Sequence, residues 1–234
     1  MGVILFKRSA VFKRQHWGYL FATIFALIIS ACLFMPGYAW LHAAGPMNTG
    51  HEKLLCEDCH VPADGNLRQQ FQANIQFLLG NRKQYSPVGF RSVSSRDCQQ
   101  CHDRPTDKHP VSRFLEPRFS KARAKISPHQ CMSCHKEHQG KRVTTVSQDY
   151  CSNCHQKLKL RKEKIDVHHV DLIKQKRWQT CLGCHDYHGN HRMKLKKRLK
   201  DIVNEQVIHE YFNGGNDPYS RNKIHKVKEI TPNG

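Results

Sequence analysis

The sequence predicts a small, mostly α-helical protein with extensive loops, preceded by one transmembrane helix. Only 38% of the 234 residues are hydrophobic, and much of that apolar material lies in one uncharged run near the N-terminus. The rest contains short segments with helical spacing of apolar residues and no strand-like alternation. Ten of the eleven cysteines recur in one five-residue pattern. Because aliphatic residues are scarce beyond the first run, we expect another apolar group to hold the chain together.

The uncharged run extends from Trp17 to Trp40 and is long enough to span a bilayer. Four basic residues precede it: Lys7, Arg8, Lys13 and Arg14. Positive charge before a span stays on the cytoplasmic side, and tryptophans suit both membrane interfaces. We therefore expect a basic cytoplasmic N-terminus over 1–16, a transmembrane anchor or uncleaved signal over 17–41, and an exported domain over 42–234.

Two other fates of this segment stay open. Signal peptidase could cleave after Ala39, in Gly37-Tyr38-Ala39, and the stretch that ends at Cys32 resembles a lipoprotein box. The run is longer than a typical signal core and continues past Cys32, which favours an uncleaved anchor. All three fates place the domain in the oxidising periplasm, beyond a bacterial inner membrane. The anchor would make the protein single-pass.

The repeated pattern is Cys-x-x-Cys-His. Its cysteines are Cys56, Cys59, Cys98, Cys101, Cys131, Cys134, Cys151, Cys154, Cys181 and Cys184, and its histidines are His60, His102, His135, His155 and His185. Composition alone predicts about 0.04 copies. The pattern is the attachment signature of c-type haem: two thiols add across the porphyrin vinyl groups, and the adjoining histidine can then ligate the iron. Thioredoxin-like pairs, zinc ribbons and disulfide frameworks do not require five copies with a fixed histidine. We therefore expect five c-type haems.

The exported domain would then be a small, irregular multihaem cytochrome wrapped around five covalent haems. Successive motifs start 42, 33, 20 and 30 residues apart, so the array is not a strict repeat. Helices are expected over 66–79, around 113–126 with Pro117 starting or kinking it, and over 194–212. The last helix can be interpreted in two ways. It could present a basic face to a membrane or a partner, or it could be an ordinary amphipathic helix that covers a haem edge.

The second axial ligands should also be histidines. Beyond the motifs and the cytoplasmic His16, the chain has His42, His51, His109, His129, His138, His168, His169, His188, His191, His209 and His225. Suitable methionines are limited to Met47 and Met193. Two histidine ligands lower the potential of a haem and a methionine raises it, so we expect low-potential sites.

His138 follows the motif histidine His135 by one helical turn, so it cannot reach the far face of the same haem and should serve a neighbouring one. His188 stands in the same relation to His185. The alternative for both is a surface histidine or a propionate ligand.

Three further distal ligands are proposed: His51 and His109, for their proximity to motifs, and His169, chosen over its neighbour His168 with little to separate them. His129 and His191 are the reserves, and His209 and His225 are expected on the surface.

At this point the chain resembles multihaem c-type cytochromes of the cytochrome c3-like family, in a pentahaem form with an N-terminal membrane anchor. The CHxxH pairs at His135/His138 and His185/His188 carry the likeness. The stretch CLGCHDYHGNH, 181–191, and the tail FNGGNDPY resemble an uncharacterised bacterial branch of that family. The resemblance covers essentially the whole exported part. It implies electron transfer among covalently bound haems and no specific reaction.

Charge indicates the partners. The formal net charge is +19, and haem propionates would reduce it to about +14 oxidised or about +9 reduced. Such a surface suits an acidic periplasmic redox acceptor or anionic lipid, and export excludes nucleic acid. We expect an electron relay without catalytic residues, not an enzyme, fed by quinol or a membrane dehydrogenase. The alternative is a small multihaem reductase for nitrite, hydroxylamine or a sulfur oxyanion, with one open haem site.

Overall fold

The computed structural model describes residues 10–35, 43–145, 147–194, 196–219, 223–225 and 227–228. The chain divides into two compact units, Met1–Pro46 and Met47–Gly234, which are described separately. Several expectations concern residues outside the described ranges: the basic Lys7 and Arg8, cleavage after Ala39, the interfacial Trp40, His42 and position 195 of the helix expected over 194–212.

The first unit contains one long helix, α1, Ala10–Phe34. Its stretch Arg14–Leu33 is long and apolar enough to cross a membrane, and none of it is buried. The expected N-terminal apolar helix is therefore confirmed, although it begins at Ala10 and not at Trp17. A signal sequence meets the same criteria, so the anchor itself stays a prediction.

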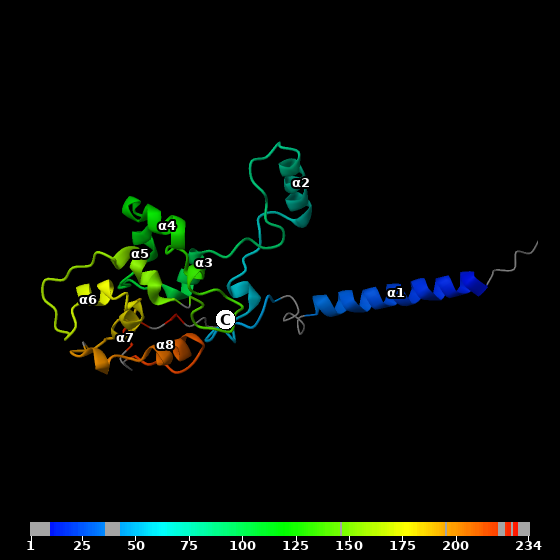
Figure 1. Ribbon diagram of the computed structural model, residues 1–234. Helices are drawn as coiled ribbons and strands as arrows, with labels where there is room; N and C mark the ends of the chain where they lie inside the picture. Colours follow the sequence, from blue (N-terminus) through cyan, green and yellow to red (C-terminus); the bar gives the residue numbers. More distant parts are fainter. Residues whose placement is uncertain are drawn as a thin grey trace, which may run out of the picture. The chain divides into compact units, whose positions relative to one another are not determined.

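The second unit consists of short helices joined by long loops (Figure 1). The α-helices are α2 Leu67–Leu78, α3 Ser95–His102, α4 Ser120–Ile126, α5 Ser152–His155, α6 His169–Lys174, α7 Cys181–Cys184 and α8 Glu205–Phe212. The 3-10 helices are η2 Cys56–Asp58, η3 Val111–Leu115, η4 Pro117–Phe119, η5 Cys131–Ser133, η6 Gln148–Cys151, η7 Trp178–Thr180 and η8 Leu199–Asp201. The described residues form no β-strand, only two isolated bridges. A mostly helical protein with extensive loop is confirmed.

Two of the three expected helices differ from the structure. The helix over 66–79 is confirmed as α2, and the Asn66 side chain caps it by accepting from the Gln69 backbone. The helix around 113–126 is interrupted because Glu116, before Pro117, is extended, and α-helix begins only at Ser120.

The single helix expected over 194–212 is wrong. The structure has η8, an extended linker and then α8, capped by Asn204. In the linker, the Val203 N–H donates to the carbonyl of Gly183. That backbone bond to α7 competes with helix formation, and Ile208 in α8 is fully buried. A membrane-facing α8 is therefore not supported.

The aliphatic core is thin. Among the described residues, only five hydrophobic side chains are buried: Ala63, Phe114, Leu172, Trp178 and Ile208. A chain of this size normally buries most of its apolar side chains in one continuous core. The expectation that side chains alone do not form the interior agrees with this arrangement.

Candidate functional site

Each Cys-x-x-Cys-His motif lies on a short helical turn, which brings its three side chains together. The five turns are η2, α3, η5, η6 with α5, and η7 with α7. In the first, third and fifth motifs, the histidine N–H donates to the carbonyl of the first cysteine, at 2.8 to 2.9 Å. This is the four-residue hydrogen bond of an α-turn. The local sequence thus presents two thiols and one imidazole on adjacent positions of one turn.

Every motif histidine faces one histidine from outside the motifs. The ring centroids are 5.9 Å apart in His51–His102, 6.3 Å in His60–His138, 6.2 Å in His109–His155, 6.2 Å in His135–His188 and 6.2 Å in His169–His185. No histidine is shared between two pairs. The five partners are the five histidines that the sequence offered as distal ligands.

The common separation has a simple chemical meaning. A metal–nitrogen bond of about 2.0 Å, plus about 1.1 Å from Nε2 to the ring centre, places two imidazoles on opposite sides of one iron about 6.2 Å apart. The planes of the paired rings cross at angles from 26° to 85°. Two imidazoles on one iron can each rotate about the metal–nitrogen axis. A constant distance between ring centroids with a variable angle between ring planes therefore fits two-histidine coordination. The residues present therefore fit a six-coordinate haem iron.

Five of the ten paired rings have an acceptor near Nδ1, whereas Nδ1 of His102 is buried without a hydrogen-bond partner. His135 Nδ1 lies 2.7 Å from the Arg142 carbonyl and His109 Nδ1 lies 2.6 Å from the Tyr187 carbonyl. Carboxylates face three more: Glu137 with His51 at 2.8 Å, Glu163 with His169 at 2.9 Å, and Asp107 with His188 at 3.1 Å. An acceptor at Nδ1 holds the proton there and leaves the Nε2 lone pair free for a metal.

Burial also keeps several of these imidazoles neutral. Burial lowers the pKa of His102 to about 4, and it lowers the pKa values of His109, His135 and His185. The pKa of His51 is raised, chiefly by its contact with Glu137. A neutral imidazole is the form that binds metal, so this environment favours ligation at four of the rings.

Asp107 connects two of the histidine pairs. Its Oδ1 accepts a hydrogen bond from the backbone N–H of His109 at 2.8 Å, and its carboxylate also contacts the ring of His188. Tyr187 lies between the same pairs: its ring stacks on His109 at 4.2 Å and meets His188 edge-on at 4.9 Å. One carboxylate and one phenol ring thus position the distal histidines of two neighbouring sites.

Motif cysteines from different sites also meet. The thiols of Cys98 and Cys131 contact each other, and so do those of Cys151 and Cys181. All eleven cysteines lie in the described part and are free of disulfides. Cavity space of about 250 Å³ lies beside the first contact, with Cys98, His102, Cys131 and His188 among its walls. The second and third motifs therefore border common space.

The local geometry of His138 differs from expectation. Residues 135–138 are not helical, and His138 has φ +61°, in the left-handed region. The helical-turn argument for His138 is therefore wrong, and so is the same argument for His188, because His185 is extended and residues 185–188 are not helical. The ring of His138 nevertheless lies opposite His60, from a different motif, and not over its neighbour His135.

The other described histidines of the second unit lie outside these pairs, and His225, expected on the surface, is half-buried with its Nε2 buried and without a hydrogen-bond partner. The side chain of His168 is 65% exposed and lies 3.6 Å from Glu163, whereas its neighbour His169 faces His185. His129 and His225 belong to none of the five pairs. His209 is partly exposed, 3.7 Å from Glu205. The assignment of ligands stays a prediction, and the structure shows which side chains are close enough to serve.

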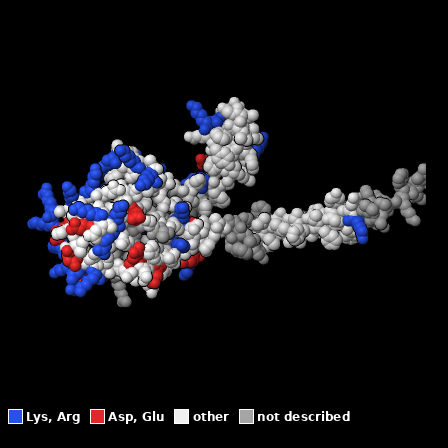
Figure 2. Space-filling view, in the orientation of Figure 1, with Lys and Arg blue, Asp and Glu red and all other residues white. Residues whose placement is uncertain are grey.

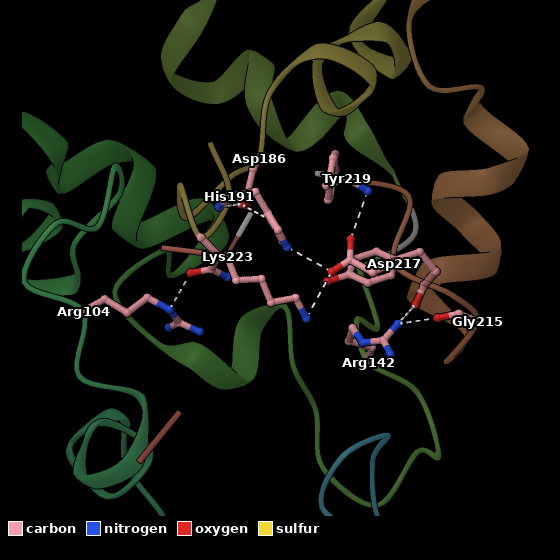
Figure 3. A network of polar contacts seen from close by, with 10 residues as sticks. Arg104, Arg142, Asp186, His191, Gly215, Asp217, Tyr219 and Lys223 are labelled. Carbon is pink, nitrogen blue, oxygen red and sulfur yellow. Dashed lines mark hydrogen bonds and ion pairs between the residues drawn. The ribbon is translucent and has the colours of Figure 1, made fainter. Parts of the chain in front are cut away.

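His191 has a structural role. Its Nδ1 lies 2.7 Å from Asp186 and its Nε2 lies 3.0 Å from Asp217, so both ring nitrogens are occupied (Figure 3). Asp217 also pairs with Lys223 at 3.4 Å, and the Tyr219 hydroxyl donates to the Leu182 carbonyl. These contacts join the segment 181–191 to the tail 212–219, the two stretches that carry the family resemblance. His191, which the sequence offered as a reserve ligand, therefore holds these two segments together.

Sequence reasoning missed the groups that orient the imidazoles. The main ones are Glu137, Glu163, Asp107 and Tyr187. Glu137 is next to His138 in sequence but contacts His51, and Asp107 is two residues from His109 but also contacts His188. A carboxylate close to a candidate ligand was a usable signal, yet the sequence did not indicate which histidine it would serve.

Among the described residues, no group of three His, Cys, Asp or Glu side chains converges as ligands of a metal ion. No protein-family model, no curated protein and no solved structure matches the chain. The functional argument therefore depends on the motifs and on the geometry of the histidine pairs.

Proposed function

We propose that this chain is a pentahaem c-type cytochrome that relays electrons in the bacterial periplasm, held at the inner membrane by α1. The observation that carries the proposal is the one-to-one pairing of five motif histidines with five others at a single separation. An unrelated set of histidines has no reason to pair in this way. Bound haem would supply a one-electron iron couple at each site.

The residues have separate roles in this proposal. The ten motif cysteines form the thioether bonds, and the motif histidines are the proximal ligands. His51, His109, His138, His169 and His188 are the distal ligands, oriented where Nδ1 has an acceptor. Because every motif histidine has a histidine partner, the arrangement favours six-coordinate, low-potential sites over a reductase with an open site.

Connections between the pairs support a relay. His138 is three residues from His135 and pairs with His60, so the first site adjoins the third. His188 is three residues from His185 and pairs with His135, so the third adjoins the fifth. The contact between Cys98 and Cys131 joins the second to the third, and that between Cys151 and Cys181 joins the fourth to the fifth. Sites linked through three residues or a sulfur contact are close enough for electron exchange without moving parts.

A basic loop marks the side at which an acceptor would dock. Figure 2 shows Lys and Arg gathered over α4 and over the loop between α5 and α6. The basic loop comprises the exposed Lys157, Lys159, Arg161, Lys162 and Lys164. Two acidic residues lie between α5 and α6: Glu163 is engaged by His169, and Asp166 accepts from the Leu199 N–H. The loop lies between His155 and His169, which belong to the fourth and fifth sites, so it fits an acidic redox acceptor there. Quinol or a membrane dehydrogenase would be the donor.

Intact mass and spectroscopy test the proposal. The exported protein, purified from a host with the haem-attachment machinery, should carry the mass of five haems and show low-spin ferric spectra. After reduction it should not bind carbon monoxide. A mass equal to that of the bare chain would refute the proposal, and high-spin signal with carbon monoxide binding would favour the reductase.

A further inference from the structure

The arm formed by residues 61–91 exposes the apolar side of its helix. In the second unit, α2 stands apart from the other helices (Figure 1). Leu67, Phe71, Ile75 and Leu78 follow helical spacing along one face, and all four are exposed, Leu78 to 81%. Most amphipathic helices turn such a face toward a core. The arm is therefore built for an apolar environment outside the protein.

Polar groups fill the inside of the arm. Gln70 is only 3% exposed, and its amide donates to the carbonyls of Ala63 and Gly65 while accepting from the Gly89 N–H. Asn74 donates to the Ser86 carbonyl and accepts from the Ser86 N–H. These bonds fasten the helix to the returning chain through its polar side. The outward position of the apolar face is thus fixed by specific contacts.

The base of the arm lies beside the first motif histidine, His60. Phe90, at the base, lies 6.1 Å from the ring of His60. The helix has 12 residues and is about 18 Å long. Leu78 and Leu79, at the C-terminal end of the helix, are 81% and 66% exposed.

The charges on the arm favour anionic lipid over a second copy of the chain. Within the arm, residues 61–91, the sequence has one acidic residue, Asp64, and four basic residues, Arg68, Arg82, Lys83 and Arg91, of which Arg91 is paired with Asp97. Two such arms would repel each other if they paired. Apolar side chains flanked by cations are the pattern of a helix at the boundary between headgroups and acyl chains.

Chain connectivity keeps the arm near a bilayer. The candidate span ends at Leu33 and the second unit begins at Met47. An extended chain of this length reaches at most about 50 Å. If α1 spans the membrane, this short connection gives the second unit a high effective concentration at the membrane surface. The entropic cost of a second membrane contact is then reduced.

We propose that α2 is a second membrane contact that lies in the outer surface of the bilayer anchored by α1, with Phe71, Ile75 and Leu78 among the acyl chains and Arg68, Arg82 and Lys83 at the phosphates. This inference rests on the proposed export and anchoring. It would hold the first haem site, between His60 and His138, near the membrane surface.

Photolabelling from the lipid phase tests the contact. Full-length protein is reconstituted in vesicles of phosphatidylethanolamine and phosphatidylglycerol that contain a phospholipid with a diazirine near the top of its acyl chain. After irradiation and trypsin digestion, mass spectrometry compares the arm peptide 69–82 with the peptide 114–118, which carries the exposed Leu115. We expect at least about fivefold more lipid label on the arm peptide, because interfacial helices bury their apolar face in the acyl boundary.

Two variants make the test specific. Phe71→Gln combined with Leu78→Gln should reduce labelling of the arm at least about threefold. The matched variant Leu115→Gln, also at an exposed apolar position, should leave arm labelling unchanged.

An unlabelled arm in the wild-type protein would overturn the inference, as would cross-links from one arm to another in place of lipid adducts. The haem mass and spectrum of the same sample, and label on the peptide containing α1, report separately on the proposed function. The two failures can therefore be told apart.

Discussion

Asp107 Oδ2 lies 3.1 Å from His188 Nδ1, although 81 residues separate the two in the chain. The same carboxylate accepts from the His109 N–H. Burial acts to raise the pKa of Asp107, but the hydrogen bond from His188 and the charges around it prevail and lower it. Asp107 is therefore an anion at neutral pH, facing the far nitrogen of a candidate iron ligand.

The variant Asp107→Asn should raise the midpoint potential of the His135–His188 site by roughly tens of millivolts, because an anion behind an imidazole makes it a stronger donor and favours ferric iron. A spectroscopic redox titration measures the shift. Asp201→Asn, at an exposed aspartate paired with Arg198, is the matched control and should leave all potentials unchanged. Equal titration curves for Asp107→Asn and wild type would refute this role.

His138→Ala should leave one site with a single axial histidine. We expect about one-fifth of the haem to become high-spin in the ferric state and to bind carbon monoxide when reduced, because only His60 would lose its partner. Electron paramagnetic resonance and carbon monoxide difference spectra measure this fraction.

His129→Ala is the control for this variant, since His129 lies close to the third motif in sequence but in none of the pairs. It should keep all five sites low-spin. A fully low-spin His138→Ala protein would contradict the pairing with His60.

Asp217→Asn should destabilise the docked C-terminal tail. Its carboxylate contacts the buried His191 and Lys223, and removing a charged partner of a buried group costs about 1–3 kcal/mol. Chemical denaturation at neutral pH measures the difference from wild type. His191→Gln should have a similar effect on stability and no effect on the low-spin spectrum, because both of its ring nitrogens are already occupied.

The effect of Asp217→Asn should depend on pH. Burial acts to raise the pKa of Asp217, but the Tyr219 N–H together with His191 and Lys223 lowers it overall. A carboxylate whose pKa is lower in the folded state stabilises the fold above its unfolded value of about 3.9, and this contribution is lost as the pH falls through the folded pKa. Denaturation curves of wild type and variant should therefore converge in acid. A constant difference at all pH values would show that charge is not the cause.

Charge reversal in the basic loop should slow reaction with an anionic oxidant. Lys159→Glu combined with Lys162→Glu should lower the second-order rate with ferricyanide roughly threefold at low ionic strength, and added salt should remove the difference. Stopped-flow mixing of the reduced protein measures the rate. Arg82→Glu with Lys83→Glu, at the tip of the arm, reverses the same number of charges far from the loop and should have a smaller effect.

The motifs and the surplus of histidines are read directly from the sequence. The mostly helical character could be predicted from it, because helical spacing is a local pattern. Position in the chain also pointed to the five histidines that face the motifs, although the helical argument for His138 and His188 was wrong. The prediction of one helix over 194–212 was wrong, although the helical periodicity is present in the sequence. The Val203 N–H donates to the Gly183 carbonyl, and no local pattern encodes that contact. The apolar face of α2 was visible in the sequence, but its exposure was not. Exposure depends on Gln70 and Asn74 bonding to a segment that returns more than ten residues later.

The histidine pairs are interleaved along the chain, which has a consequence for how the protein matures. A chain delivered from its N-terminus completes each pair only when the later histidine emerges, in the order His102, His138, His155, His185 and His188. In the proposed cytochrome, His135 would therefore wait for the last of these, after its own thiols had met their haem. Until then it would have no axial partner, so a nascent chain truncated just before residue 188 should hold one reactive iron that the finished protein would conceal.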